Sequence, residues 1–355
     1  MSRTLTKSKP KMEKKRRRKR EKQKQFEQFE QSKPMQLQLF ELEPSDKDYS
    51  QTVELYDFIP KYNWGKAKRI EGEFLRTIKR EFECRGKKYH LTLMPARIED
   101  GKDGSKEYYP SQREELVEDA LRKMMTEKQS IMLDGEAGIA FTLYQLQKEL
   151  SEKGHTYSYD ELKDAIRVLN GTDIILKDEN ETVESAFSPI ESYGFAGEGQ
   201  ETKTFVKFSP LVTHSIKTGN FRMVNYDTSM SLKSVIARQL HKRMSHHYIQ
   251  ASLTNAYDIK LTTIVRDFGL TLQKRIQYNL SEVEKALEMM KQKNVIINYK
   301  IEKVFELKPR RKLVDARIFL QPHPHFINDI IRANKNAKRV KELSDGISRS
   351  DPHDA

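Results

Sequence analysis

Two stretches of the chain, 121 residues apart, share one pattern and restrict its fold more than any other feature. The first runs from 159 to 169 and continues into 172–176, and the second runs from 280 to 290 and continues into 293–297, without a gap between the copies. In both, apolar residues at helical spacing precede a β-branched run. Each copy predicts an amphipathic helix that leads directly into a strand, with Asp160 and Ser281 as the expected N-caps. The apolar positions are Leu162, Ala165, Ile166 and Leu169 in the first copy, and Val283, Ala286, Leu287 and Met290 in the second.

Two further helical patterns precede each copy. They cover 114–125 and 142–152, closed by Gly154, and then 232–246 and 261–268, closed by Gly269. Three helices followed by a two-stranded hairpin form the winged helix-turn-helix plan. The sequence therefore predicts a mainly helical α+β protein with two tandem winged-helix domains. A chance match between two ordinary amphipathic helices is the alternative, and the ungapped continuation from helix to strand argues against it.

A chain of 355 residues is long enough for two or three domains. We expect a disordered basic tail at 1–48, a lead with short strands at 49–110, a first winged-helix domain at 111–215, a second at 216–325 and a basic tail at 326–355. The single cysteine, Cys84, cannot form an internal disulfide, which favours a reducing cytoplasm. No apolar run approaches the roughly 20 residues of a membrane span. The sequence predicts a soluble, cytoplasmic protein without membrane partners.

The net charge of +13 is concentrated at the N-terminus. Residues 1–25 contain 13 Lys and Arg against two acids, whereas the rest of the chain has 52 Lys and Arg against 50 acids. The basic block at 14–20 could add phosphate contacts or only improve solubility. The remaining chain is close to neutral, so any attraction to DNA must come from how its charges are distributed.

The two expected wings differ sharply in charge. The first, 172–201, has eight acids and only Lys177 as a base, whereas the second, 295–320, has seven bases and three acids. Because DNA is a polyanion, only the second wing can approach it without electrostatic repulsion. Its expected tip contains Arg310, Arg311 and Lys312, placed to reach a phosphate or the minor groove. A solvated hairpin turn is the alternative interpretation.

Other residues of the second half carry groups suited to DNA. Several lie on the helix expected at 232–246, and others fill the segment before the third helix. Arg, Asn and Gln can pair with guanine or adenine edges, and residues at the start of a recognition helix enter the groove. Glu282, Glu284 and Glu288 count against contact by the later turns of that helix. The full predicted DNA-binding set is Arg238, Lys242, Arg243, Lys274, Arg275, Gln277, Asn279, Lys285, Arg310, Arg311 and Lys312.

A short motif lies in the expected N-terminal tail. Gln36-Leu37-Gln38-Leu39-Phe40 is similar to the pentapeptide, typically Gln-Leu-Ser-Leu-Phe, by which bacterial proteins dock on the DNA polymerase sliding clamp. Leu39 and Phe40 would fill an apolar pocket, with Leu37 beside them and Gln36 bonding at its edge. A linker strand that packs on the folded domain is the alternative.

Together these pieces resemble the replication initiators of theta-replicating plasmids, of the replication initiator protein A and TrfA-like groups. The resemblance covers roughly 49–325 and rests on Tyr49–Asp57 with Pro60–Tyr62, on Pro110–Glu118 and on Ala237–Arg243. It implies two winged-helix domains, of which the second binds repeated DNA sites called iterons and the first serves dimerisation and extra DNA contact. It also implies origin opening on double-stranded DNA, monomer and homodimer forms, and recruitment of a host replicative helicase and the sliding clamp.

Catalytic interpretations find little support in the sequence. His323-Pro324-His325 is similar to the metal-binding pair of rolling-circle initiators, but no tyrosine nucleophile follows Tyr299. The pair His246-His247 fits a helix-capping or surface role better than a metal site. The glycine-rich segments lack the ending of a phosphate-binding loop. We therefore expect no enzyme activity, cofactor or metal. A winged-helix transcriptional repressor is the alternative function, and a single inverted repeat over its own promoter would favour it over direct repeats at an origin.

Overall fold

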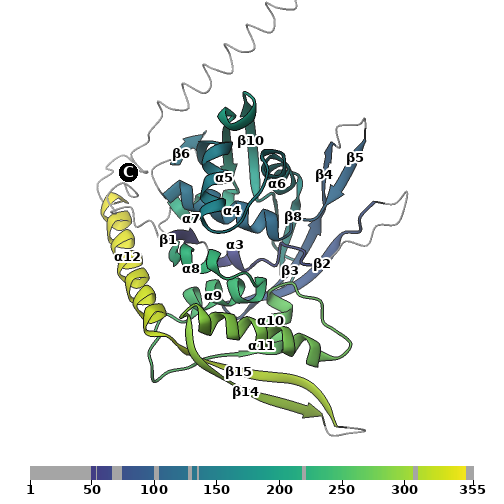
Figure 1. Ribbon diagram of the computed structural model, residues 1–355, viewed down its shortest axis with the longest axis vertical. Helices are drawn as coiled ribbons and strands as arrows, with labels where there is room; N and C mark the ends of the chain where they lie inside the picture. The colour runs from purple at the N-terminus through teal and green to yellow at the C-terminus, as the bar shows by residue number, and fades with distance from the viewer. Residues whose placement is uncertain are drawn as a thin grey trace, which may run out of the picture.

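Antiparallel strand pairs and helices of moderate length make up an α+β fold, as the sequence predicts (Figure 1). The computed structural model describes residues 49–52, 54–65, 74–99, 104–126, 130–133, 136–217, 221–306 and 311–348. The basic block and the clamp-like motif at 36–40 lie outside these residues. Within the described ranges, no helix has the length and apolar character that a bilayer crossing requires.

The first group of helices forms where the sequence predicts it. α4 (Gln112–Met124), α5 (Leu143–Glu152) and α6 (Tyr159–Gly171) each start with a capping box. Ser158 caps α6 by accepting from the backbone N–H of Glu161 at 3.2 Å, so Asp160 is not the N-cap that we expected. The apolar faces of the three helices meet in one core, which includes Leu116, Leu146 and Ile166.

The strand after α6 pairs in an unexpected place. β8 (Asp173–Asp178) lies between β3 (Lys87–Met94) and β9 (Glu184–Phe187), and β2 (Ile78–Cys84) completes this sheet in the order β2-β3-β8-β9. The hairpin expected at 172–201 is present in a shorter form, because β8 and β9 pair antiparallel directly after α6. These two strands also extend a sheet built by the N-terminal lead, because Ile174 and Leu176 bury one face against Phe82, Leu91 and Leu93.

A second hairpin follows β9. β10 (Ile190–Ala196) and β11 (Lys203–Phe208) pair with each other across the short 3₁₀ turn Gly199–Glu201. β11 also pairs with β7 (Glu136–Thr142), which in turn pairs with β6 (Ser130–Leu133). We call α4 through β11 the first unit.

The lead at 49–110 is part of the fold rather than an appendage. β1 (Tyr49–Thr52) pairs with β12 (Arg222–Asn225), and α3 (Glu54–Phe58) follows it. β4 (Ala96–Glu99) and β5 (Ser105–Tyr108) form a separate hairpin that projects from the first unit (Figure 1). Pairing between β1 and β12 joins segments separated by most of the first unit.

The second group of helices also appears where it is expected. α9 (Val235–His247) leads into β13 (Tyr257–Lys260), followed by α10 (Leu261–Asp267) and α11 (Ile276–Gln292). β14 (Ile296–Glu306) and β15 (Lys312–Pro322) form a long hairpin, and β13 pairs with β15. α11 begins after Arg275, earlier than expected, so Ser281 lies inside the helix and is not its N-cap. We call α9 through β15 the second unit.

The core clusters divide the chain later than the sequence suggests. The first cluster extends through Ile216 to Met230, and the second begins at Leu232. The boundary expected between 215 and 216 falls inside α7 (Pro210–Lys217), which precedes α8 (Tyr226–Ser231).

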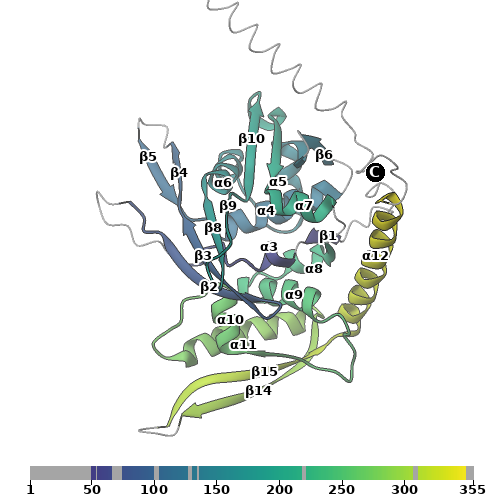
Figure 2. The ribbon, with the colours of Figure 1, turned by 180° about the vertical axis from the view of Figure 1, so that it is seen from behind.

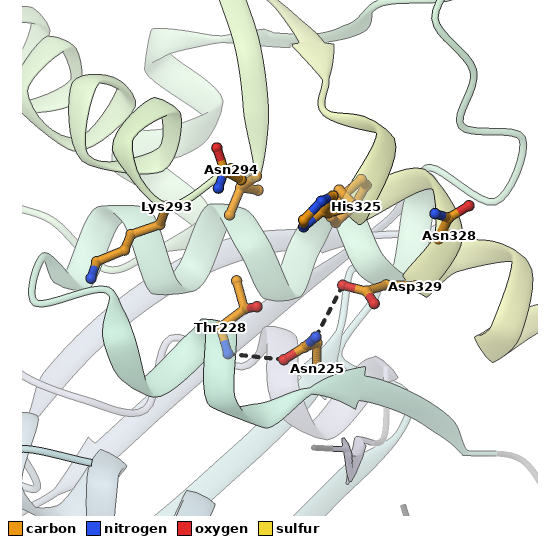
Figure 3. Close-up of a pocket in the computed structure, with 9 residues that line it drawn as sticks. Asn225, Thr228, Lys293, Asn294, His325, Asn328 and Asp329 are labelled. Carbon is orange, nitrogen blue, oxygen red and sulfur yellow. Dashed lines mark hydrogen bonds between the residues drawn. The ribbon is translucent and has the colours of Figure 1, made fainter.

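The segment expected to be a C-terminal tail from 326 contains a long helix. α12 (Pro324–Ser348) runs along one side of both units (Figure 2). Phe326 and Ile330 enter the second core, and Asn334 accepts from Arg222 on β12 at 2.7 Å. Near its start, Asp329 accepts from Asn225 at 3.1 Å beside a polar cavity of about 340 Å³ (Figure 3). α12 therefore links β12 to the second unit.

Candidate nucleic-acid interface

The loop before α11 is held in one conformation by a buried amide. Asn279 Oδ1 accepts from the backbone N–H of Gln273 at 2.9 Å, and Asn279 Nδ2 donates to the carbonyl of Thr271 at 3.0 Å. The residue is only 8% exposed. Its amide is committed to the loop rather than to a base, which corrects the prediction that Asn279 contacts DNA. It instead fixes the position of the residues around it.

The other predicted residues of this segment do face solvent. Lys274, Arg275 and Gln277 are all exposed, at the point where α11 begins. Lys285 is also exposed but pairs with Glu282 across 2.7 Å on the same helix. No side chain caps the first turn of α11. The positive end of the helix dipole and two cationic side chains therefore coincide at its start.

The β14–β15 hairpin carries the second set of cations. β14 runs back from the end of α11, so the ends of β14 and β15 that flank the hairpin turn lie at the same end of the second unit as the loop before α11 (Figures 1 and 2). Arg311 and Lys312 are exposed beside that turn, and Arg311 lies 4.2 Å from the Phe305 ring centroid. Arg310 lies outside the described residues. Lys303 on β14 is exposed as well.

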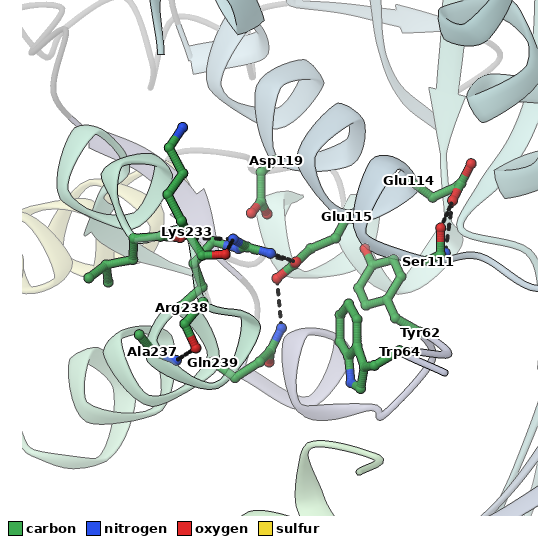
Figure 4. Close-up of polar contacts among 12 residues, drawn as sticks. Tyr62, Trp64, Ser111, Glu114, Glu115, Asp119, Lys233, Ala237, Arg238 and Gln239 are labelled. Atoms are coloured by element: carbon green, nitrogen blue, oxygen red, sulfur yellow. Dashed lines mark hydrogen bonds and ion pairs between the residues drawn. The ribbon is translucent and has the colours of Figure 1, made fainter. Parts of the chain in front are cut away.

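Two of the three predicted residues of α9 lie between the units instead. Arg238 is fully buried and donates to Glu115 of α4 at 2.7 Å (Figure 4). Lys242 reaches Asp119 at 2.6 Å. Gln239 also donates to Glu115, at 2.8 Å. A fully buried guanidinium cannot contact DNA, so the DNA-binding roles predicted for Arg238 and Lys242 are corrected to docking of α9 on α4.

The third of these residues, Arg243, is also engaged in the interior. It pairs with Asp267 at 3.0 Å and lies over the ring of Phe58, which belongs to α3. Its side chain is only 11% exposed. Arg243 therefore joins α9 to α10 and to the lead, and its predicted contact with DNA is corrected in the same way.

Charge pairing, rather than burial alone, sets the protonation states in this interface. Burial acts to raise the pKa of the Glu115 carboxyl, but the Arg238 guanidinium and the Lys242 ammonium lower that pKa below its usual value. Burial likewise opposes the charge on Lys242, and the carboxylates of Asp119 and Glu115 raise its pKa. Glu115 and its cationic partners therefore remain charged at neutral pH, whereas burial raises the pKa of the Asp119 carboxyl.

The lead completes the contact between the units from its other side. Lys61 pairs with Glu118 of α4 at 3.4 Å, and Tyr62 donates to the same carboxylate at 2.5 Å. The neighbouring Trp64 donates from Nε1 to the carbonyl of Phe268 at 2.6 Å. Asp57 of α3 forms an ion pair with Arg122 of α4. No local pattern indicated these contacts, although Pro60–Tyr62 was among the segments that carry the family resemblance.

Most acids of the segment 172–201 lie on β8, on β9 or on the turn between them, in the N-terminal sheet, whereas β10 pairs with β11 in another sheet. The one base of this segment, Lys177, pairs with Glu184 at 3.1 Å and Glu181 at 3.3 Å. No net positive patch remains there to attract a polyanion, in contrast to the hairpin of the second unit.

The histidines considered for metal binding have other surroundings. His323 and His325 pack edge to face, with ring centroids 4.8 Å apart. His246 and His247 lie against Phe58 at 5.3 and 4.8 Å, so this pair packs on the lead rather than lying on the surface. Within the described ranges, no three His, Cys, Asp or Glu side chains are grouped closely enough to hold a metal ion.

Two residues that the predicted set omits shape the candidate interface. Asp315 of β15 accepts from the backbone N–H and hydroxyl of Thr262, at 3.0 and 2.8 Å, and so ties the hairpin to the start of α10. Leu272 projects from the loop before α11 and is 62% exposed. Leu272 could have been noticed in the sequence, because it is an apolar residue within a polar run. The contact between Asp315 and Thr262 could not, because the two residues are brought together only by the fold.

No protein-family model and no curated protein sequence matches the chain. Among solved structures, it is similar to domains 2 and 3 of RctB, with a TM-score of 0.46 and 11% identity over 72% of this chain and 94% of that one. A second RctB structure of the same domains has a TM-score of 0.43 and 11% identity, over 74% and 96%. The Pi initiator protein in complex with iteron DNA has a TM-score of 0.43 and 14% identity, over 59% and 90%.

Proposed function

We propose that this chain is a replication initiator that binds repeated sites in origin DNA through its second unit. The observation that carries the proposal is the coincidence of two exposed cationic elements at one end of that unit. The start of α11 presents Lys274, Arg275 and Gln277, and the hairpin beside it presents Lys303, Arg311 and Lys312.

The order of elements in the second unit supports this interpretation. A helix, a strand, two helices and a hairpin, with β13 beside β15, is the arrangement of a winged helix. In such a unit the third helix enters the major groove by its first turn, and the wing contacts the flanking backbone. We therefore assign α11 as the recognition helix and β14–β15 as the wing. We propose that the first unit is a winged helix as well, with β10–β11 as its hairpin.

The two cationic elements have different roles in the proposal. Arg275 and Gln277 can form paired hydrogen bonds with base edges, so they supply sequence preference. Lys303, Arg311 and Lys312 neutralise phosphates, so they supply affinity that depends on salt and little on sequence. Binding at an array of sites would strain the adjacent duplex and favour opening at flexible A·T-rich steps.

Footprinting with the full-length protein on the DNA that flanks its gene tests the proposal. We expect protection of direct repeats spaced by about two helical turns. Protection of one inverted repeat over the promoter would instead identify a repressor, and absence of any footprint would contradict DNA binding. The same protein should neither nick supercoiled origin DNA with Mg²⁺ nor hydrolyse ATP, and covalent attachment to a DNA 5′ end would overturn the proposal.

Partner recruitment is a separate part of the proposal. The family resemblance favours a host helicase that loads on the opened origin, and Gln36, Leu37, Leu39 and Phe40 favour docking on the sliding clamp. A peptide of residues 33–44 should bind the clamp with an affinity on the order of micromolar, since a short segment pays ordering entropy. No binding at about 100 µM would exclude the clamp while leaving DNA binding unaffected.

A further inference from the structure

Two large apolar side chains are exposed within the cationic start of α11. Leu272 is 62% exposed and Tyr278 is 58% exposed, and Lys274, Arg275 and Gln277 lie between them in the chain. A single exposed apolar residue is common on protein surfaces. Two of them around three exposed polar residues, at the start of one helix, call for an explanation.

The structure holds Leu272 outward rather than leaving it there by chance. The buried amide of Asn279 bonds to the residues on both sides of it, the carbonyl of Thr271 and the N–H of Gln273. Upstream, the N–H of Leu270 donates to the carbonyl of Val265 at 3.0 Å, and Gly269 adopts φ +65° to close α10. The loop therefore cannot turn Leu272 inward without breaking hydrogen bonds of a buried side chain.

Asn279 also ties the backbone on either side of Leu272 to the turn of α11 that carries Tyr278. It follows Tyr278 directly in the chain, so its bonds to 271 and 273 draw the loop against the first turn of α11. A preformed apolar element flanked by cations fits a ligand that offers apolar groups close to phosphates. In the major groove of duplex DNA, the apolar group that base edges present is the 5-methyl of thymine.

We propose that Leu272 and Tyr278 contact thymine methyl groups in the major groove, beside the base edges that Arg275 and Gln277 reach. This inference rests on the proposed function and adds to it a preference for thymine at the positions facing this apolar pair. Asn279 acts as a positioning residue, because it fixes the loop and makes no contact with DNA itself.

The test compares thymine with deoxyuridine, which lacks only the methyl group. Full-length protein selects sites from a random duplex library, and the recovered sites are resynthesised with deoxyuridine in place of thymine, one position at a time. Binding should weaken about fourfold for each contacted methyl, the effect expected from burying one methyl group. Leu272→Ala should bind the thymine and deoxyuridine sites nearly equally at one or more positions, whereas Leu272→Met and Tyr278→Phe should keep the discrimination.

Leu253→Ala is the matched control. Leu253 is also exposed, at 51%, but precedes β13, whose first residue pairs with Leu320 at the opposite end of β15 from the hairpin turn. It should retain full discrimination. Asn279→Ser should reduce discrimination as Leu272→Ala does, and thermal melting of each variant separates this effect from loss of folding.

The outcomes distinguish this inference from the proposed function. Equal binding of thymine and deoxyuridine sites by the natural protein would overturn the methyl contact while leaving DNA binding intact. Failure to select any site would instead contradict the proposed function. A Leu272→Ala variant that keeps its discrimination but changes the oligomeric state would assign the apolar pair to contact between copies of the chain.

Discussion

The two units share an order of helices but differ in the pairing of the strand after the third helix and in the charge of the first helix. After α6, β8 pairs with β9 and also with β3 of the N-terminal sheet, whereas after α11, β14 pairs with β15 alone. α4 offers the carboxylates Glu115 and Asp119, and α9 offers the matching cations Arg238 and Lys242. The repeated pattern therefore specifies the helices, while burial and charge decide how each unit is used.

The distribution of charge gives the two units different roles in the proposed function. Arg238 and Lys242 of α9 pair with α4 and are not available to DNA, whereas the cations at the start of α11 and on the hairpin remain exposed. In the first unit, the acidic strands β8 and β9 offer no comparable cluster of cations, because their one base, Lys177, is paired with Glu181 and Glu184. In the proposed function, the first unit therefore holds the second in place, and the second binds DNA.

The largest effect should come from the contact between the first helices of the units. Arg238→Met leaves Glu115 buried without its principal partner, which should lower the free energy of unfolding by about 3–5 kcal/mol. Urea denaturation at pH 7 measures it. Lys285→Met is the control, because Lys285 pairs with Glu282 at the surface and should contribute at most about 1 kcal/mol. Equal losses in the two variants would mean that α4 and α9 do not dock through this pair.

Neutralising the hairpin tests which unit binds DNA. Changing Lys303, Arg311 and Lys312 to Gln should reduce the slope of log affinity against log salt by up to about three, and weaken binding on the order of a hundredfold at 0.15 M salt. The control neutralises Lys148, Lys163 and Arg167 on α5 and α6, an equal change in net charge on the first unit. If both variants lose the same affinity, total charge rather than the hairpin governs binding.

Each unit contains one buried histidine whose pKa is lowered below its usual value. Burial lowers the pKa of His241 to about 3, and neither of its ring nitrogens has a hydrogen-bond partner among the described residues. Burial also lowers the pKa of His155, whose ring nitrogen lies 3.0 Å from the carbonyl of Met230.

The direction of the His241 effect is set by this lowered pKa. The contribution of neutral His241 to the free energy of unfolding is fully present above the pKa of histidine in the unfolded chain, about 6.5. This contribution is lost as the pH falls from 6.5 towards 3, because the unfolded chain binds the proton in that range and the folded protein does not. Stability should fall by up to about 1.4 kcal/mol per pH unit in that window. Urea unfolding at pH 7 and pH 5 should show a smaller pH dependence in His241→Leu. An unchanged pH dependence would show that His241 is not buried in its neutral form.

How far the sequence could predict this fold is clearest from particular elements. Helices at 114–125, 142–152 and 261–268 were placed to within two residues of α4, α5 and α10, because their apolar period is a local property. The pairing of β8 with β3 could not be predicted, because β3 lies far earlier in the chain and nothing in the local sequence pattern indicates which strand pairs with β8. The N-cap of α6 was missed although Ser158 and Glu161 carry the capping-box spacing.

The candidate site shows the same limit. Lys274, Arg275 and Gln277 face solvent as predicted, since a polar run before an amphipathic helix is a local signal. Arg238 and Lys242 look like surface cations in sequence, but their partners Glu115 and Asp119 lie 123 residues away on another helix. Long-range charge pairing decides whether a cation is available to DNA, and no periodicity reveals it.

The smallest predicted effect compares the starts of the two third helices. α6 starts with the Ser158 capping box, whereas α11 starts at Arg275, whose side chain makes no cap. Ser158→Ala should destabilise the fold by about 1 kcal/mol, and Arg275→Ser should stabilise it by a few tenths up to about 1 kcal/mol, because serine can satisfy a backbone N–H of the first turn. Arg275→Ser should at the same time weaken binding to the preferred site by roughly 1–3 kcal/mol.

If Arg275→Ser raises the stability of the fold and weakens DNA binding, α11 lacks an N-cap side chain because Arg275 contacts DNA instead. A variant that loses stability and keeps its site preference would mean that Arg275 supports the fold, and that the two third helices are used alike.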